Sequence, residues 1–105
     1  MTPTDPLTET VDRLVGQVGH WTPPRWAASG ASGVPRAGTV HDLVQWLADR
    51  SADAEHRPRR PVPRLDNDLA LPDQLRVVAA DLARFGGPVL AGEAVEKIQA
   101  VRGQL

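Results

Sequence analysis

Apolar residues recur at helical spacing in four separate stretches of this 105-residue chain. The steps between them are mostly three or four residues, which places them on one face of a helix with 3.6 residues per turn. Two proline-rich segments separate the stretches, and no segment makes a persuasive strand. The sequence therefore predicts an all-α protein, a small four-helix bundle with two long Pro-rich connecting loops.

The expected helices lie at about residues 6–18, 39–54, 72–85 and 88–102 of a single helical domain, 1–105. Thr4 or Asp5 can cap the first helix, because a short polar side chain accepts a hydrogen bond from the free N–H groups of a first turn. Gly19 is the expected end of that helix. Thr39 is the expected N-cap of the second helix.

The third and fourth helices are separated only by a Gly-Gly-Pro break at residues 86–88. Such a short connection is typical of two helices that pack as a hairpin. Val77 and Phe85 are expected to widen the apolar face of the third helix. Of the 43 hydrophobic residues that make up 41% of the chain, 14 are alanine, which favours close packing of helices over thick sheets.

Composition excludes several classes of protein. The net charge of -1 removes the general electrostatic argument for a nucleic-acid or membrane-surface protein. The absence of cysteine excludes disulfides and thiolate metal sites. There is neither a secretory signal pattern nor an apolar run of bilayer length, so we expect a cytoplasmic protein. Eleven arginines against one lysine suggest a GC-rich bacterial genome.

The two connecting loops, residues 20–38 and 55–71, are much longer than the usual connection of about 4 to 6 residues. Long loops in a compact domain are usually functional, extended over the surface, or disordered. Two of the three tryptophans lie in the first loop, and four of the eleven arginines lie in the second. Candidate functional residues are therefore sought in these loops.

The first loop contains the segment Trp-Thr-Pro-Pro-Arg-Trp at residues 21–26. Tryptophan is costly to expose to water and is enriched at the centres of protein interfaces. Two interpretations are open. Either both rings fold back as a lid over the helices and supply apolar area, or the diproline presents them to a partner.

The second loop contains Arg-Pro-Arg-Arg-Pro-Val-Pro-Arg at residues 57–64, in which the prolines favour an extended, polyproline-like shape. Extended arginines can bind an acidic protein or follow a phosphate backbone. Alternatively, Glu55, Asp66, Asp68 and the acidic second helix neutralise them within the same molecule. No aromatic residue lies among these arginines to stack on bases, which weighs against nucleic acid.

Catalytic and metal-binding motifs are weak. The three histidines, at positions 20, 41 and 56, lie in separate segments without a metal-ligand spacing. Asp66, Asn67, Asp68 and Asp73 bring oxygen ligands together but lack the glycine and closing glutamate of a calcium loop, so an Asx-turn is favoured. The glycine-rich residues 29–33 lack the lysine of a phosphate-binding loop, which favours a flexible linker. No enzyme activity, cofactor or metal is therefore expected.

We interpret the chain as a non-catalytic protein-binding or regulatory module whose partner is another protein or a second copy of itself. The alternative is a nucleic-acid-binding regulator that uses the arginine segment and the last two helices. No membrane and no small-molecule ligand is indicated. The candidate binding residues are Trp21, Pro23, Pro24, Arg25, Trp26, Arg57, Arg59, Arg60 and Arg64.

Overall fold

The computed structural model describes residues 5–105, so the alternative cap Thr4 lies outside the described residues. Within that range the chain is all-α, as the periodicity predicts, and contains five α-helices and no named strand. The elements are α1 (Pro6–Val18), α2 (Pro23–Ala27), α3 (Arg36–Ala54), the 3₁₀ turn η1 (Asp68–Ala70), α4 (Leu71–Phe85) and α5 (Gly87–Gln104).

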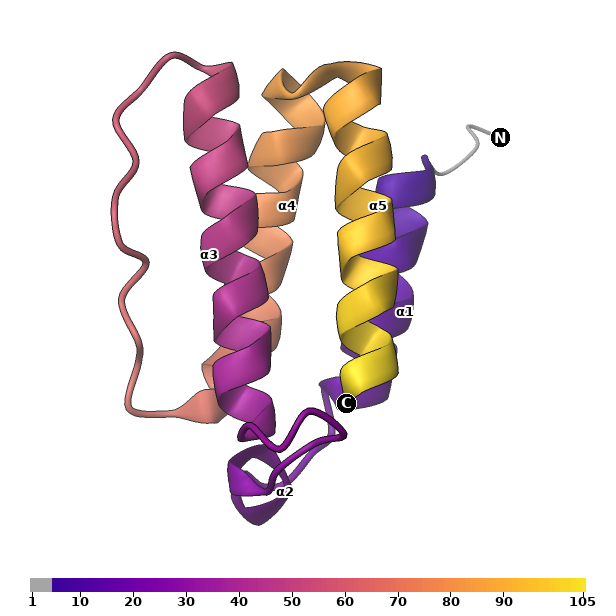
Figure 1. Ribbon diagram of the computed structural model, residues 1–105, viewed down its shortest axis with the longest axis vertical. Coiled ribbons are helices and arrows are strands. Elements are labelled where there is room, and N and C mark those ends of the chain that lie inside the picture. Colours follow the sequence, from indigo (N-terminus) through magenta and orange to yellow (C-terminus); the bar gives the residue numbers. More distant parts are fainter. Residues whose placement is uncertain (1–4) are drawn as a thin grey trace.

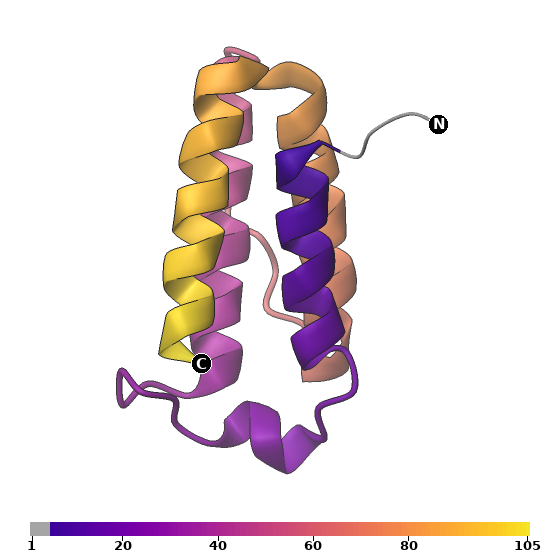
Figure 2. The same cartoon turned by 90° about the vertical axis from the view of Figure 1, so that its right-hand side faces the viewer.

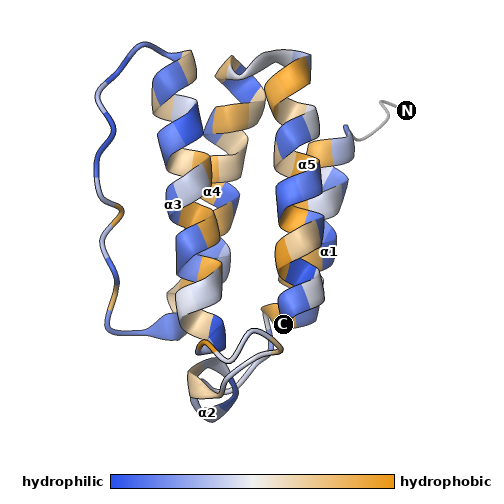
Figure 3. Ribbon diagram, viewed as in Figure 1, coloured by the Kyte–Doolittle hydropathy of each residue, from blue (hydrophilic) through white to orange (hydrophobic). Residues whose placement is uncertain are grey.

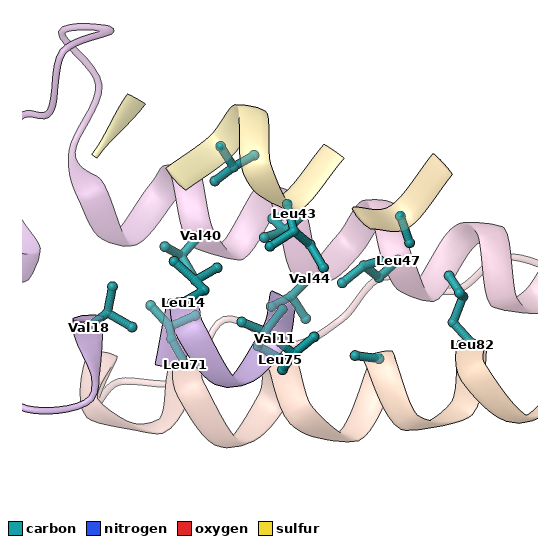
Figure 4. Close-up of a cluster of buried hydrophobic side chains, with 14 of the residues drawn as sticks. Val11, Leu14, Val18, Val40, Leu43, Val44, Leu47, Leu71, Leu75 and Leu82 are labelled. Carbon is teal, nitrogen blue, oxygen red and sulfur yellow. The ribbon is translucent and has the colours of Figure 1, made fainter. Parts of the chain in front are cut away.

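The four long helices lie side by side, and the short helix α2 crosses one end of them (Figures 1 and 2). Helix α3 packs mainly against α4, and α1 packs against both α4 and α5. Their apolar faces meet in one core (Figure 4), whereas the long segment beside α3 is largely hydrophilic (Figure 3). The core includes Val11, Leu14, Val18, Val40, Leu43, Val44, Leu47, Leu71, Leu75 and Leu82.

Helix α1 has the bounds that its local sequence predicts. The Asp5 carboxylate accepts hydrogen bonds from the backbone N–H of Thr8 at 2.9 Å and from its hydroxyl at 2.8 Å. These bonds stabilise the ionised form and lower the pKa of Asp5. At the other end, Gly19 is the C-cap, and its N–H donates to the Val15 carbonyl.

Helix α3 begins three residues earlier than expected, at Arg36, so the prediction that Thr39 is the N-cap is wrong. Thr39 lies inside the first turn, and no side chain caps the helix. Instead, the N–H of Arg36 donates to the Ala28 carbonyl at 2.9 Å, and its guanidinium Nε donates to the Leu105 carbonyl at 3.1 Å. The Ala28 carbonyl, eight residues away in the sequence, therefore accepts from the first N–H of the helix where no side chain caps it.

The expectation that Val77 and Phe85 widen the buried face of α4 is also wrong, because they are 62% and 49% exposed. Helix α4 buries Leu71, Leu75 and Leu82, which lie at steps of four and seven. Val77 falls on the opposite side of the helix from this stripe, where no other helix covers it.

Helix α3 ends at Ala54 and is followed by the C-cap Glu55. The next residue, His56, has a φ of +56° and is the only non-glycine residue with positive φ within residues 5–105. The N–H of Arg57 donates to the Ala52 carbonyl at 2.8 Å, and the N–H of His56 donates to the Asp53 carbonyl at 3.2 Å. This is the Schellman pattern, in which glycine is the usual left-handed residue. The backbone of His56 is therefore strained, because in this left-handed conformation its Cβ atom lies close to the following carbonyl oxygen.

We expect His56→Gly to raise the free energy of unfolding by about 0.5–1 kcal/mol, because glycine relieves this strain but gives the unfolded chain more freedom. Urea denaturation followed by circular dichroism measures the change. His56→Ala is the control, because alanine keeps the Cβ atom and should give no gain. Equal stabilisation by both substitutions would show that the backbone conformation is not the cause.

Candidate functional site

Both tryptophans of the first loop lie in the core. Trp21 is 5% exposed and Trp26 is fully buried, and their rings pack edge to face with centroids 5.0 Å apart. The guanidinium groups of Arg25 and Arg36 lie 5.1 and 5.7 Å from the centre of the Trp21 ring. Of the two interpretations of these residues, the structure matches the lid, and neither ring is exposed to a partner. In this segment the exposed residues include Pro23 and Pro24.

The glycine-rich residues 29–33, for which the sequence favours a flexible linker, form a hydrogen-bonded turn. The N–H of Gly30 donates to the Val34 carbonyl at 3.0 Å, and that of Gly33 donates to the Gly30 carbonyl at 3.0 Å. The N–H of Ala31 donates to the Gln104 carbonyl at 2.8 Å. These N–H groups are thus directed at protein carbonyls, and the turn docks against the end of α5.

The arginine-rich segment forms a strap, residues 57–67, that runs back along the outer side of α3 to the start of α4 (Figure 1). Its backbone is held by side chains of both helices. The Gln45 amide donates to the Arg60 carbonyl at 3.0 Å and accepts from the Val62 N–H at 2.7 Å. The His41 Nε2 donates to the Val62 carbonyl at 3.0 Å, and the Gln74 amide donates to the Pro63 carbonyl at 3.1 Å.

Because His41 and Gln45 are four residues apart, they lie on one face of α3 and reach the strap together. The sequence shows His41 only as a histidine without a metal-ligand spacing, and it does not identify Gln45 or Gln74. The only signal available was a pair of polar residues at helical spacing, and most such pairs simply face water. Their role depends on where the strap lies.

The strap has one apolar anchor. Val62 is half-buried against the core, whereas every other residue of the strap is exposed. A cavity of about 230 Å³ remains under the strap, between α3 and α4. Ser51 lines this cavity and is buried, and its hydroxyl has no hydrogen-bond partner among the residues that the structure describes.

The arginines of the strap are largely neutralised within the molecule. Arg57 pairs with Glu55, Arg59 with Asp53 at 2.6 Å, and Arg64 with Asp68 at 3.1 Å. Within residues 5–105, the fourth arginine, Arg60, has no ion-pair partner. The hydrogen bond from Arg59 lowers the pKa of Asp53. All of these pairs are solvent-exposed, so each contributes only about 0–1 kcal/mol.

An apolar depression adjoins the end of the strap that leads into α4. Leu65, Leu69 and Val77 are 44%, 46% and 62% exposed. Leu65 and Val77 line a shallow hollow of about 460 Å³ between the strap and α4, together with Val62 and Val78. Exposed apolar residues that cluster beside charged ones are typical of a protein interaction surface.

The other candidate ligands are not brought together. His20 and His56 are exposed, and the Asn67 side chain accepts from the Leu69 N–H at 3.0 Å, which is the Asx-turn that begins η1. Within residues 5–105, no group of three or more histidine or acidic side chains is placed to hold a metal ion. In the same range, no helix combines the length and the apolar character needed to cross a bilayer.

Comparison with models of protein families, with curated proteins and with solved structures gave no match to this chain.

Proposed function

We propose that this chain is a non-catalytic protein-binding module, in which a four-helix bundle of α1, α3, α4 and α5 supports the strap as its recognition surface. The partner is a protein with an acidic amphipathic segment. The observation that carries the proposal is that the strap backbone is fixed to α3 and α4 by four side-chain hydrogen bonds, while its arginines stay exposed.

The geometry of the strap supports an acidic partner. Four arginines lie within eight residues, and no acidic residue lies among them. Arg60 has no acidic partner in the described part of the chain, and the exposed pairs of Arg57, Arg59 and Arg64 are weak enough to exchange for a partner carboxylate. Guanidinium groups bind carboxylates through two parallel hydrogen bonds.

The depression beside Leu65 and Val77 adds the apolar part of the contact. An apolar side chain of the partner can enter this hollow, and Arg64 directly precedes Leu65 of its lining in the chain, where it is exposed to a partner carboxylate. An interface of this kind has an apolar centre and a charged rim. A nucleic acid would use the same arginines but would leave the hollow unfilled, so we argue for the protein partner.

Charge reversal of the strap tests this proposal. The probe is a fluorescently labelled acidic amphipathic peptide built from glutamate and leucine, and its binding is measured by anisotropy at low salt. We expect the double substitution Arg59→Glu and Arg60→Glu to weaken binding at least about tenfold. The matched control, Arg13→Glu with Arg102→Glu on α1 and α5, should leave the affinity nearly unchanged.

The same measurement separates the other occupants. Equal binding by both double variants, or no binding of the peptide at all, would contradict the proposal. Salt-sensitive binding of labelled DNA or RNA that only the strap variant loses would support the nucleic-acid regulator instead. Self-association that the strap variant abolishes, measured by sedimentation, would place a second copy on this surface and overturn the choice of partner.

A further inference from the structure

We infer that the groove between α3 and α4 is itself a receptor for an extended, proline-containing segment of a partner protein, and that the strap occupies it in cis. This inference concerns the face beneath the strap and goes beyond the proposed function, which uses the outward-facing arginines. The groove is built by His41, Gln45 and Ser51 of α3 and by Gln74 and Val78 of α4.

The groove recognises backbone atoms, so its occupant is not limited to the strap sequence. Gln45 binds a carbonyl and an N–H two residues apart, as a neighbouring strand would in a sheet. His41 and Gln74 bind two further carbonyls, those of Val62 and Pro63. Only one N–H of the occupant is used, and that is the N–H of Val62.

This pattern explains why proline fits. Positions 61 and 63 are prolines, which have no N–H to donate, and the groove requires none there. The residue between them supplies the N–H and the half-buried aliphatic side chain. The chemistry of the fitting segment is therefore proline, a small aliphatic residue, and proline in an extended conformation.

The strap is held by hydrogen bonds to its backbone and by few buried side chains. Its only partly buried side chain is Val62, and its ion pairs are solvent-exposed. Segments with few buried apolar contacts open at low free-energy cost. A partner segment present at sufficient concentration can therefore displace the strap without unfolding the helices.

The strap also leaves the groove incompletely satisfied. The cavity of about 230 Å³ stays open beneath it, and the buried hydroxyl of Ser51 has no hydrogen-bond partner in the described residues. The Oε1 atom of Gln74 is likewise buried and unpartnered there. Buried polar atoms are normally satisfied, so a longer side chain that fills the cavity and bonds to Ser51 would suit the groove better than the strap.

The chain offers its own probe for this groove. The probe is a labelled peptide with the sequence of residues 59–65, and the receptor is a variant in which residues 58–65 are replaced by glycine and serine in equal number. We expect the variant to bind the peptide at least about tenfold more tightly than the wild type, because the tethered strap competes at a high effective concentration.

Three controls assign the binding to the groove. Adding Gln45→Ala to the variant should weaken binding about tenfold, since it removes two backbone hydrogen bonds. Gln99→Ala, an exposed glutamine of α5, should have no effect. Replacing the valine of the peptide by aspartate should abolish binding, because that side chain would enter the apolar side of the groove.

A folded variant that does not bind the peptide, or that binds equally well with Gln45→Ala, would overturn the inference. If the variant does not fold, the wild type is tested by NMR with millimolar peptide. Displacement should then shift the resonance of the Val62 N–H and increase its hydrogen exchange, and an unchanged resonance would also overturn the inference. The acidic peptide used above does not contact Gln45 in our proposal, so the two ideas fail separately.

Discussion

Replacing Trp26 by alanine is expected to lower the free energy of unfolding by about 3–5 kcal/mol. The Trp26 ring is fully buried and packs edge to face on Trp21, at the end of the helices that α2 closes (Figure 2). Its removal would leave a large cavity in a small core. Domains of this size have only about 5–15 kcal/mol of stability, so the loss is a large share. Urea denaturation followed by far-ultraviolet circular dichroism measures it.

Trp46→Ala is the control for this prediction. The Trp46 ring is only half-buried, on α3, where Arg50 and Lys97 lie 5.3 and 5.8 Å from its centre. Part of its area is already in water, so we expect roughly half the loss or less. An equal loss from both substitutions, or little loss from Trp26→Ala, would show that α2 is not an essential part of the core.

Gly30→Ala is expected to lower the free energy of unfolding by about 1–3 kcal/mol. A Cβ atom at this position would lie 2.5 Å from the carbonyl oxygen of Gln104, which is a backbone atom and cannot simply rotate away. The neighbouring N–H of Ala31 donates to that same carbonyl at 2.8 Å. The clash would therefore separate the turn from the end of α5.

Gly16→Ala, in the interior of α1, is the matched control because a Cβ atom there meets nothing within 4 Å. Alanine should stabilise the helix at that position by about 0.5–1 kcal/mol, so the two substitutions are expected to have opposite signs. Thermal unfolding by calorimetry compares them with the wild type. A neutral or stabilising Gly30→Ala would mean that the turn does not dock tightly on α5.

Helix limits are predictable from sequence where the signals are local. Asp5 and Gly19 are the N-cap and C-cap of α1, and both act within their own turn. Thr39 fails as a cap because the free N–H of Arg36 is satisfied by the Ala28 carbonyl, in a segment folded against the start of α3. No local pattern contains that contact.

In the candidate site, too, the features set by local sequence are predictable and those set by distant contacts are not. The arginine and proline pattern predicts an extended, charged segment, and the nearby acidic residues Glu55 and Asp68 are predictable partners for its arginines. The pattern did not show that His41, Gln45 and Gln74 bind the strap backbone, because a polar residue on a helix surface looks the same whether it faces water or another segment.

Local spacing in the sequence decides that this chain is helical, where α1 begins and ends, and that residues 57–64 are extended. These properties depend on neighbouring residues, within about one helical turn. Only the tertiary structure decides that Trp21 and Trp26 are buried and that the strap lies on α3. Burial and backbone pairing depend on which distant segments meet, and no pattern of neighbouring residues contains that information.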